Sequence, residues 1–216
     1  MRLFATLTLL TIAAVSQAQP ELPPPSTEPI PKGTYTLDKA HASLLFRLNH
    51  LGFSRFTGRF ASFDARLDLD PRKLGASSVD VTIDPRSIST DNAPDGFLDM
   101  LTGKSWLDAA EFPEVKFVSR RVEVVSPTDL RVHGELTLRG VTRPIVLAAS
   151  FNGGYASHPF EPQARVGFSA QGSFKRSDFG LAEGIPTGNS TFGVSDEVQV
   201  VLEAEFNGPP LKVAKQ

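Results

Sequence analysis

The chain of 216 residues contains no cysteine. Its fold therefore has no disulfide bonds, and an exported protein without them needs a hydrophobic core that holds the fold alone. The same absence excludes thiol catalysis, thiolate metal sites and a lipid anchor on cysteine. The chain also has no large excess of either charge, since it contains 22 Lys and Arg residues and 24 Asp and Glu residues. This balance argues against nucleic acid as a partner, because nucleic acids are bound by basic faces.

Long apolar runs are absent except at the start of the chain. Residues 3–15 are apolar apart from three threonines, follow Arg2 and precede Ser16-Gln17-Ala18. A membrane-spanning helix needs roughly 20 apolar residues, so this run is too short to span. A basic start, a short apolar core and small residues at the end predict a signal peptide over residues 1–18. We therefore expect a periplasmic or secreted protein that does not span the membrane.

The segment after the expected cleavage site is rich in proline. Gln19 to Pro31 holds six prolines in thirteen residues and shows no apolar periodicity. Such a segment favours an extended linker, which we place at residues 19–32. The remainder predicts one domain over residues 33–208, followed by a C-terminal tail over residues 209–216.

An alternation of apolar and polar side chains with a period of two recurs along this domain. Such alternation is typical of strands with one buried and one solvated face. It covers eight segments, residues 44–50, 63–69, 79–83, 115–117, 130–138, 145–151, 166–174 and 198–206. Gly134 falls at an inward position, where a missing side chain leaves room for a neighbour or a ligand. Arg139-Gly140 predicts a tight turn in which glycine takes a positive φ.

Eight amphipathic strands fit either a two-sheet sandwich or a closed up-and-down barrel. We predict the all-β barrel, eight-stranded, antiparallel and lipocalin-like, because closure removes exposed sheet edges and eight strands can enclose one small ligand. Charged side chains on one face of each strand argue against a membrane barrel, whose outer face is apolar. Phe60 is out of phase with the residues from Phe63 onward, which predicts a bulge or bend near Ala61-Ser62.

One segment between strands, residues 92–110, departs from this pattern. Phe97, Leu98 and Leu101 lie at helical spacings, and Trp106 and Leu107 follow. This predicts one or two short helices, capped by Asp91 or Asn92 with Pro94 in the first turn. The segment would plug one end of the barrel or form a lid over a ligand tunnel, and the two readings are compatible.

Signatures of enzymes are missing. The sequence contains no G-x-S-x-G, no phosphate-binding glycine loop and no H-E-x-x-H. His41 and His50 are nine residues apart, roughly 30 Å in extended chain, and cannot share a metal ion without a sharp bend. We therefore expect no catalytic residues, no metal ligands and no cofactor. His50 shares an apolar face with Phe46 and would meet a ligand's polar head, and an ion pair within Arg176-Ser177-Asp178 would pin a barrel mouth.

The aromatic residues are dominated by phenylalanine, with 16 Phe against two Tyr and one Trp. Phenylalanine offers a large apolar area without a polar group, so a Phe-rich interior favours an apolar ligand over a sugar or nucleotide. The alternative is that these rings only fill the core.

Seven short motifs, in order and at matching spacing, resemble the YceI-like, polyisoprenoid-binding family. They run from about Tyr35 to Phe206 and comprise Tyr35-Thr36-Leu37-Asp38 with His41, Phe46 to Gly52, Gly58-Arg59-Phe60, Ile83-Asp84 to Thr90, Phe112 to Phe117 with Ser119, Gly134 to Thr142, and Arg176 to Gly180. The resemblance implies a lipocalin-like barrel with a long tunnel that holds a polyprenyl chain, often with a quinone or similar head. The family is typically periplasmic or secreted and is not an established enzyme family. Many members carry a His-Leu pair where this chain has Phe97-Leu98, so the resemblance implies an apolar wall at that point without the histidine.

The leading functional expectation is therefore the binding of a long isoprenoid lipid, for carriage, storage or sequestration outside the cytoplasm. The residues expected to bind it are Leu44, Phe46, Leu48, His50, Phe60, Leu98, Leu101, Trp106, Phe117, Phe168 and Phe179. One alternative is an enzyme that acts on a lipid or quinone, using His41, His50 or the Arg176/Asp178 pair. Another is an interaction module with a solidly packed barrel that serves a membrane redox partner. Assembly as a homodimer is also left open.

Overall fold

Ten antiparallel strands and one short helix make up most of the protein, in a computed structural model that describes residues 27–188 and 190–210. The expected signal peptide and the first part of the linker lie outside these residues, as does most of the expected tail. The strands are β1 (Gly33–His50), β2 (Ser54–Phe60), β3 (Phe63–Leu69), β4 (Ser78–Ile83), β5 (Ile88–Ser89), β6 (Val115–Val124), β7 (Asp129–Leu138), β8 (Val141–Tyr155), β9 (Gln163–Lys175) and β10 (Glu197–Pro210). The helix is α1 (Phe97–Thr102), and three 3₁₀ turns cover Leu74–Ala76, Pro85–Ser87 and Arg176–Phe179.

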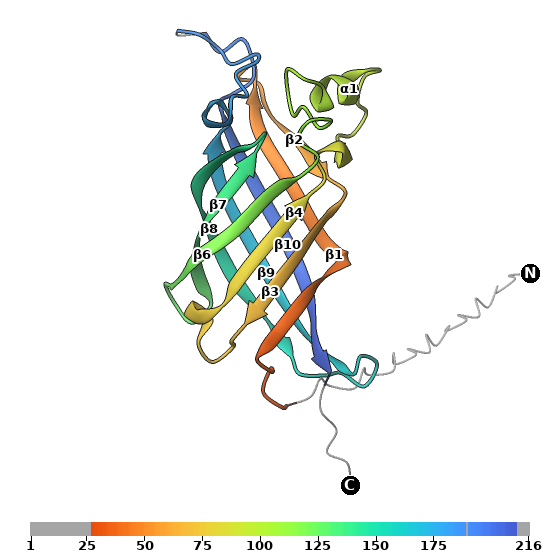
Figure 1. Ribbon diagram of the computed structural model, residues 1–216, viewed down its shortest axis with the longest axis vertical. Helices are drawn as coiled ribbons and strands as arrows, with labels where there is room; N and C mark the ends of the chain where they lie inside the picture. Colours follow the sequence, from red (N-terminus) through yellow and green to blue (C-terminus); the bar gives the residue numbers. More distant parts are fainter. Residues whose placement is uncertain (1–26, 189, 211–216) are drawn as a thin grey trace, which may run out of the picture.

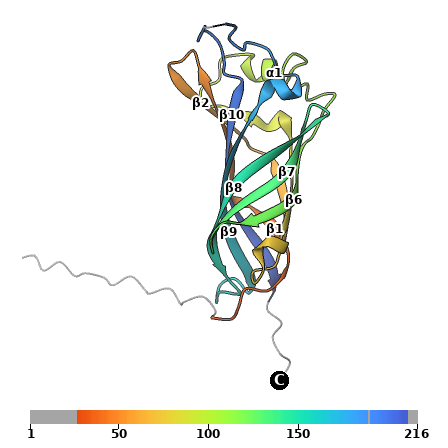
Figure 2. The same cartoon turned by 90° about the vertical axis from the view of Figure 1, so that its left-hand side faces the viewer.

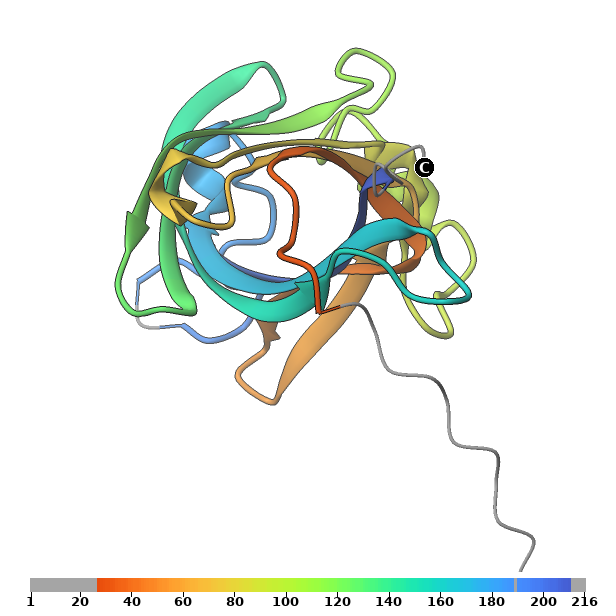
Figure 3. The same ribbon diagram turned by 90° about the horizontal axis from the view of Figure 1, so that it is seen from below.

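Eight of these strands close into a barrel. They follow the order β10, β9, β8, β7, β6, β4, β3, β1, and pairing between β10 and β1 closes the ring. The ring is seen end-on in Figure 3. Each of the eight predicted segments lies in one of these ring strands, so the predicted antiparallel eight-stranded barrel is confirmed.

Along one of its edges, strand β1 pairs first with β3 and then with β2. Its first residues, Gly33 to Thr36, pair with β3, whereas Leu44 to His50 pair with β2. Between these stretches its register with β10 shifts from Leu37 to Ala42. The chain therefore bends at Ala61 between β2 and β3, where the phase change of the apolar residues predicted a bulge or bend. Strands β2 and β5, which the alternation had not predicted, extend the sheet beyond β1. Figures 1 and 2 show β2 at the same end of the barrel as α1.

The segment between β5 and β6 contains one short helix, as predicted. Only Phe97 to Thr102 form an α-helix, and Trp106 lies in a turn after it. The helix begins after Gly96, whose φ of 75° is left-handed, so the expected caps at Asp91 and Asn92 are wrong. Within the described residues no helix has the length and apolarity needed to cross a bilayer.

The interior holds two clusters of apolar side chains. The larger runs along the barrel and includes Tyr35, Leu67 and Phe206, all 6% exposed or less. The smaller lies under α1 and joins Phe46, Ile88, Leu101 and Val198. The turn between β7 and β8 has positive φ at Arg139 and at Gly140, as predicted for the glycine.

Candidate ligand-binding site

A cavity of about 460 Å³ lies inside the barrel and reaches the α1 end. This volume falls within the range of roughly 300–1,000 Å³ that is typical of small-molecule sites. Deep in the barrel its wall is built from inward side chains such as Val81, Ile145, Leu147 and Leu202. Near α1 the exposed residues Asn92 and Met100, among others, complete it. The barrel is thus packed at one end and hollow at the other, so its interior is not filled throughout by its own side chains.

Two phenylalanine rings form part of the wall because glycines face them. A Cβ atom on Gly134 would lie 2.4 Å from the ring of Phe117, and one on Gly58 would lie 2.3 Å from the ring of Phe46. Real Cβ atoms essentially never come this close, so a side chain at either position would have to displace the facing ring. The predicted room at Gly134 is therefore confirmed, and it is taken by a neighbouring ring.

Eight of the eleven residues expected to bind a ligand line this cavity. They are Leu44, Phe46, Leu48, His50, Phe60, Leu101, Trp106 and Phe117. Contact with a ligand remains a prediction for all of them, but the structure places them around one space.

The other three expected residues lie outside the lining, each for a local reason. Phe168 is further down the barrel, where its ring centre lies 5.1 Å from that of Phe151 and 6.3 Å from that of Phe206, so it belongs to the packed half. Phe179 is 1% exposed and stands edge-on behind Phe174, which does line the cavity. Leu98 lies off the face of α1 that carries Phe97 and Leu101 into the lining, because these two are four residues apart and share one side.

Sequence reasoning missed the contribution of β2 and β5. Phe56, Ile88 and Thr90 line the cavity, and none was named as a site residue. The ring of Phe56 reaches α1, with its centre 6.1 Å from that of Phe97. The alternation of Phe56, Gly58 and Phe60 was a signal of a strand, but the interrupting glycine and the short length concealed it.

In the part of the chain that the structure describes, Arg176 is the buried charged residue, and it lines the cavity. Its side chain donates hydrogen bonds to four backbone carbonyls, those of Leu181, Glu183, Val194 and Ser195, at 2.6–2.9 Å. The guanidinium carbon lies 5.4 Å from the centre of the Trp106 ring. Burial lowers its pKa, although the nearby charges of Asp196 and Glu183 oppose the shift.

The expected ion pair between Arg176 and Asp178 is therefore wrong, because the Arg176 guanidinium donates its hydrogen bonds to neutral backbone carbonyls instead. Asp196 instead accepts hydrogen bonds from the backbone and hydroxyl of Ser177. Asp178 is exposed and does not line the cavity. Of the residues named for a lipid-modifying enzyme, only His50 and Arg176 border the same space.

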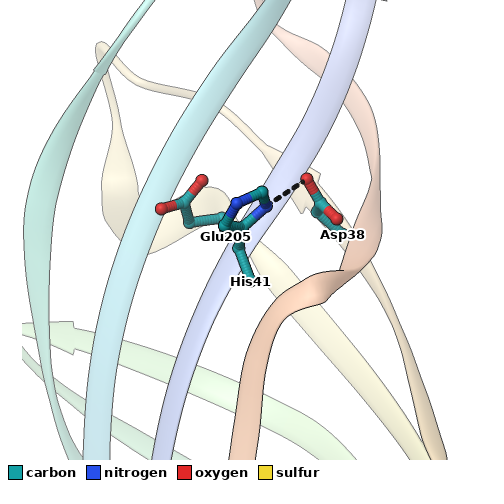
Figure 4. A group of neighbouring side chains, drawn as sticks. All are labelled: Asp38, His41 and Glu205. Carbon is teal, nitrogen blue, oxygen red and sulfur yellow. Dashed lines mark hydrogen bonds and ion pairs between the residues drawn. The ribbon is translucent and has the colours of Figure 1, made fainter.

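A second polar group, on the outer face of the barrel, contains His41 (Figure 4). Asp38, His41 and Glu205 bring one ligand atom each within 4.8 Å of one another, a spacing that would suit a metal ion. Arg165 already occupies this group, since its Nη1 lies 2.8 Å from Asp38 Oδ2, 2.5 Å from Glu205 Oε2 and 3.5 Å from His41 Nδ1. The guanidinium supplies the positive charge that a metal ion would supply. The arrangement is that of an ion-pair network.

Comparison with known proteins agrees with this architecture. The family model described as "YceI-like domain" matches residues 35–206. A UPF0312 protein of Vibrio cholerae is 35% identical over 173 residues, which cover 79% of this chain and 85% of that protein. The crystal structure of the Campylobacter jejuni YceI protein is 34% identical with a TM-score of 0.62, covering 80% of this chain and 96% of that one.

A more distant structure shares the fold. It is a polyisoprenoid-binding domain from Saccharophagus degradans, 15% identical with a TM-score of 0.59, covering 81% of this chain and 98% of that one. The family match spans the whole barrel, from the start of β1 to the last residues of β10. The chain therefore belongs to the YceI-like domain family.

Proposed function

We propose that this protein binds a long isoprenoid lipid in the barrel cavity and holds it unchanged, for carriage, storage or sequestration outside the cytoplasm. The observation that carries the proposal is a cavity of about 460 Å³ whose deep wall is apolar on every side. Such a space favours a hydrocarbon chain, because polar molecules would lose hydrogen bonds to water there. The description of the Saccharophagus domain as polyisoprenoid-binding supports the same class of ligand.

Affinity for such a chain should depend on its length. Burial of a five-carbon isoprene unit contributes about 3–4 kcal/mol, at about 0.8 kcal/mol per methylene-sized group. The measured gain will be smaller, because binding also orders a flexible chain. Affinity should therefore rise with each added unit until the cavity is full, and then level off.

Trp106 gives this proposal a direct readout, because it is the single tryptophan and lines the cavity. Titration with prenyl alcohols of two to nine isoprene units should change its fluorescence, with affinity rising along the series to a plateau. Ala170→Phe, which adds a ring to the cavity wall, should weaken binding and shorten the chain length at which affinity stops rising. Ala148→Phe, on the exposed face of β8, should leave both unchanged. Equal affinity for short and long chains would contradict the proposal.

Two exposed rings near the mouth fit exchange of the ligand with a membrane. Phe53 and Phe192 are 87% and 81% exposed, and the Leu51 N–H donates to Gly193 O, which joins the two loops that carry them. Changing both to serine should slow transfer of a prenyl lipid from vesicles while affinity for the same lipid in detergent stays unchanged. If the variant transferred the lipid as fast as the unaltered protein, these rings would not serve carriage, and storage would remain the proposed role.

The native ligand and compartment can be tested together. Protein purified from its own host should begin near Gln19 and release an intact prenyl lipid into organic solvent, as measured by mass spectrometry. A chain that retains residues 1–18 would overturn export. A lipid recovered only in chemically altered form would overturn simple binding.

A further inference from the structure

The hairpin formed by β1 and β2 carries three arginines on one face. On β2, Arg55 and Arg59 stand two residues to either side of Thr57, and on β1 Arg47 lies opposite Thr57. Successive side chains of a strand point to opposite faces, so these arginines share the face turned away from Phe46, which lines the cavity. We call Arg47, Arg55 and Arg59 the arginine face. It lies on the outside of the barrel.

The arginine face has no partner among the described residues. Its three side chains make no hydrogen bond or ion pair there, and Arg55 and Arg59 are exposed. Most other arginines of the described chain pair with a carboxylate or donate to a carbonyl, and Arg72 is the one further exception. Glu197 lies two residues before the β10 partner of Arg47 and forms no ion pair with it. The positive charge of this face is therefore available to a molecule outside the chain.

The tip of the same hairpin adds an exposed aromatic ring. Phe53 directly precedes β2 and is 87% exposed, and Phe192, 81% exposed, lies in the loop that is hydrogen-bonded to this tip. Figure 2 shows β2 standing out from the barrel at the end where α1 lies, which is also the end that the cavity reaches. Basic side chains beside exposed aromatic rings are typical of surfaces that rest on an anionic membrane. An acidic protein would account for the arginines, whereas a membrane accounts for the rings as well.

We propose that the arginine face docks this protein on an anionic lipid membrane, with Phe53 entering the headgroup layer and the cavity end held towards the lipids. The inference rests on the proposed function, because it names the surface with which the prenyl lipid is exchanged. The partner is thereby a bilayer that carries negative head groups, and a neutral bilayer would lack the charge that the arginines require.

Spacing along the hairpin ranks the three arginines. A strand rises about 3.3 Å per residue, so along its axis Arg55 lies about 7 Å from Phe53, Arg47 about 13 Å and Arg59 about 20 Å. The headgroup layer is about 5–8 Å thick, and electrostatic screening acts over about 8 Å at about 0.15 M salt. Arg55 should therefore contribute most at this salt concentration. All three should contribute at about 0.01 M salt, where the screening length is about 30 Å.

Co-sedimentation with lipid vesicles tests the proposal, using protein purified from its own host. The unaltered protein should bind vesicles of phosphatidylglycerol mixed with phosphatidylcholine, and should bind phosphatidylcholine alone far more weakly. A basic side chain near an anionic surface contributes about fivefold in affinity, so Arg55→Gln should weaken binding about fivefold at about 0.15 M salt. Arg72→Gln is the matched control, since it removes the same charge from an unpaired arginine in the turn after β3, and it should change nothing.

Two triple variants separate charge from other effects of substitution. Glutamine in place of Arg47, Arg55 and Arg59 should weaken binding about a hundredfold at about 0.01 M salt. Lysine at the same three positions keeps the charge and should keep most of the binding. If the lysine variant loses binding as fully as the glutamine variant, the inference is overturned. Phe53→Ser should weaken binding without altering its dependence on salt, and unchanged binding would overturn insertion of the ring.

The outcomes distinguish this inference from the proposed function. Prenyl alcohol binding, followed by Trp106 fluorescence, should be the same in every arginine variant. A protein that binds prenyl alcohols but not anionic vesicles would overturn the docking surface alone, and one that binds vesicles but no prenyl alcohol would overturn the proposed function alone. Binding to polyglutamate with none to vesicles would replace the membrane with an acidic protein partner and overturn the inference.

Discussion

At the scale of single residues, Arg165 joins three strands and a loop on the outer face of the barrel. It pairs with Asp38 of β1, Glu205 of β10 and Glu161 in the loop before β9, and its side chain is only 14% exposed. Arg165→Met should lower the free energy of unfolding by about 2 kcal/mol, because three carboxylates lose their partner. Arg66→Met, which breaks the exposed pair with Asp68, should cost less than about 1 kcal/mol. Urea denaturation of both variants at pH 7 measures the contrast.

The cost of Arg165→Met should depend on pH. Hydrogen bonds from His41 and from Arg165 hold the pKa of Asp38 below its ordinary value, and those from Tyr155 and Arg165 do the same for Glu161. A depressed pKa contributes stability above the ordinary value and loses it as pH falls. The difference between the two proteins should therefore be full at pH 7 and shrink below about pH 4. A difference that stays constant down to pH 3 would show that packing, rather than charge, is responsible.

Tyr35 gives a prediction at alkaline pH. The residue is fully buried, its hydroxyl donates to Pro31 O at 2.6 Å, and burial raises its pKa to about 12. The unfolded chain would ionise near 10, so the folded state loses this contribution as pH rises from 10 to 12. Tyr35→Phe should cost about 1 kcal/mol at pH 8, since the carbonyl loses its donor. That deficit should narrow towards pH 12, as measured by denaturant unfolding, and a deficit that widens would contradict this account.

At the scale of elements, the contact between β1 and β2 sets the width of the cavity. The ring of Phe46 lies directly over Gly58 on the paired strand. Gly58→Ala should push this ring into the cavity, weaken prenyl alcohol binding, and destabilise the fold by about 1–3 kcal/mol. Gly167→Ala is the matched control, because its added Cβ would lie 3.7 Å from Asn152 Cβ, an ordinary contact. If the two variants lost affinity equally, the contact between Phe46 and Gly58 would not be what shapes the binding site.

At the scale of the whole molecule, one end of the barrel is packed by its own side chains and the other encloses the cavity, so a molecule that binds there should stabilise the fold. A ligand present at 100 times its Kd stabilises the folded state by about 2.7 kcal/mol. For a domain of this size that corresponds to a rise in Tm of about 5–10 °C, since 1 kcal/mol shifts Tm by roughly 2–4 °C. Calorimetry with a saturating prenyl alcohol should show this rise. The Ala170→Phe variant should show a smaller one, and equal shifts would place the ligand outside the cavity.

The eight strands of the ring were predictable from the sequence because side-chain alternation is a local property. Leu44, Phe46 and Leu48 share one face of β1 whatever surrounds that strand, and so do Val166, Phe168 and Ala170 of β9. The same parity identified Gly134 as an inward position. It could not show that β1 changes partners from β3 to β2, because that exchange brings Gly33 opposite Leu69, far along the chain, while Leu44 pairs with Phe60.

The depth of each residue in the barrel was decided only by the tertiary structure. Phe46 and Phe168 both point inward, yet Phe46 borders the cavity and Phe168 lies in the packed half. Alternation distinguishes inside from outside, whereas depth follows from the stagger between neighbouring strands, which long-range hydrogen bonding sets. The carbonyl partners of Arg176 were also decided by the tertiary structure, because they lie 5 to 19 residues further along the chain in the loop between β9 and β10, where no sequence pattern marks them.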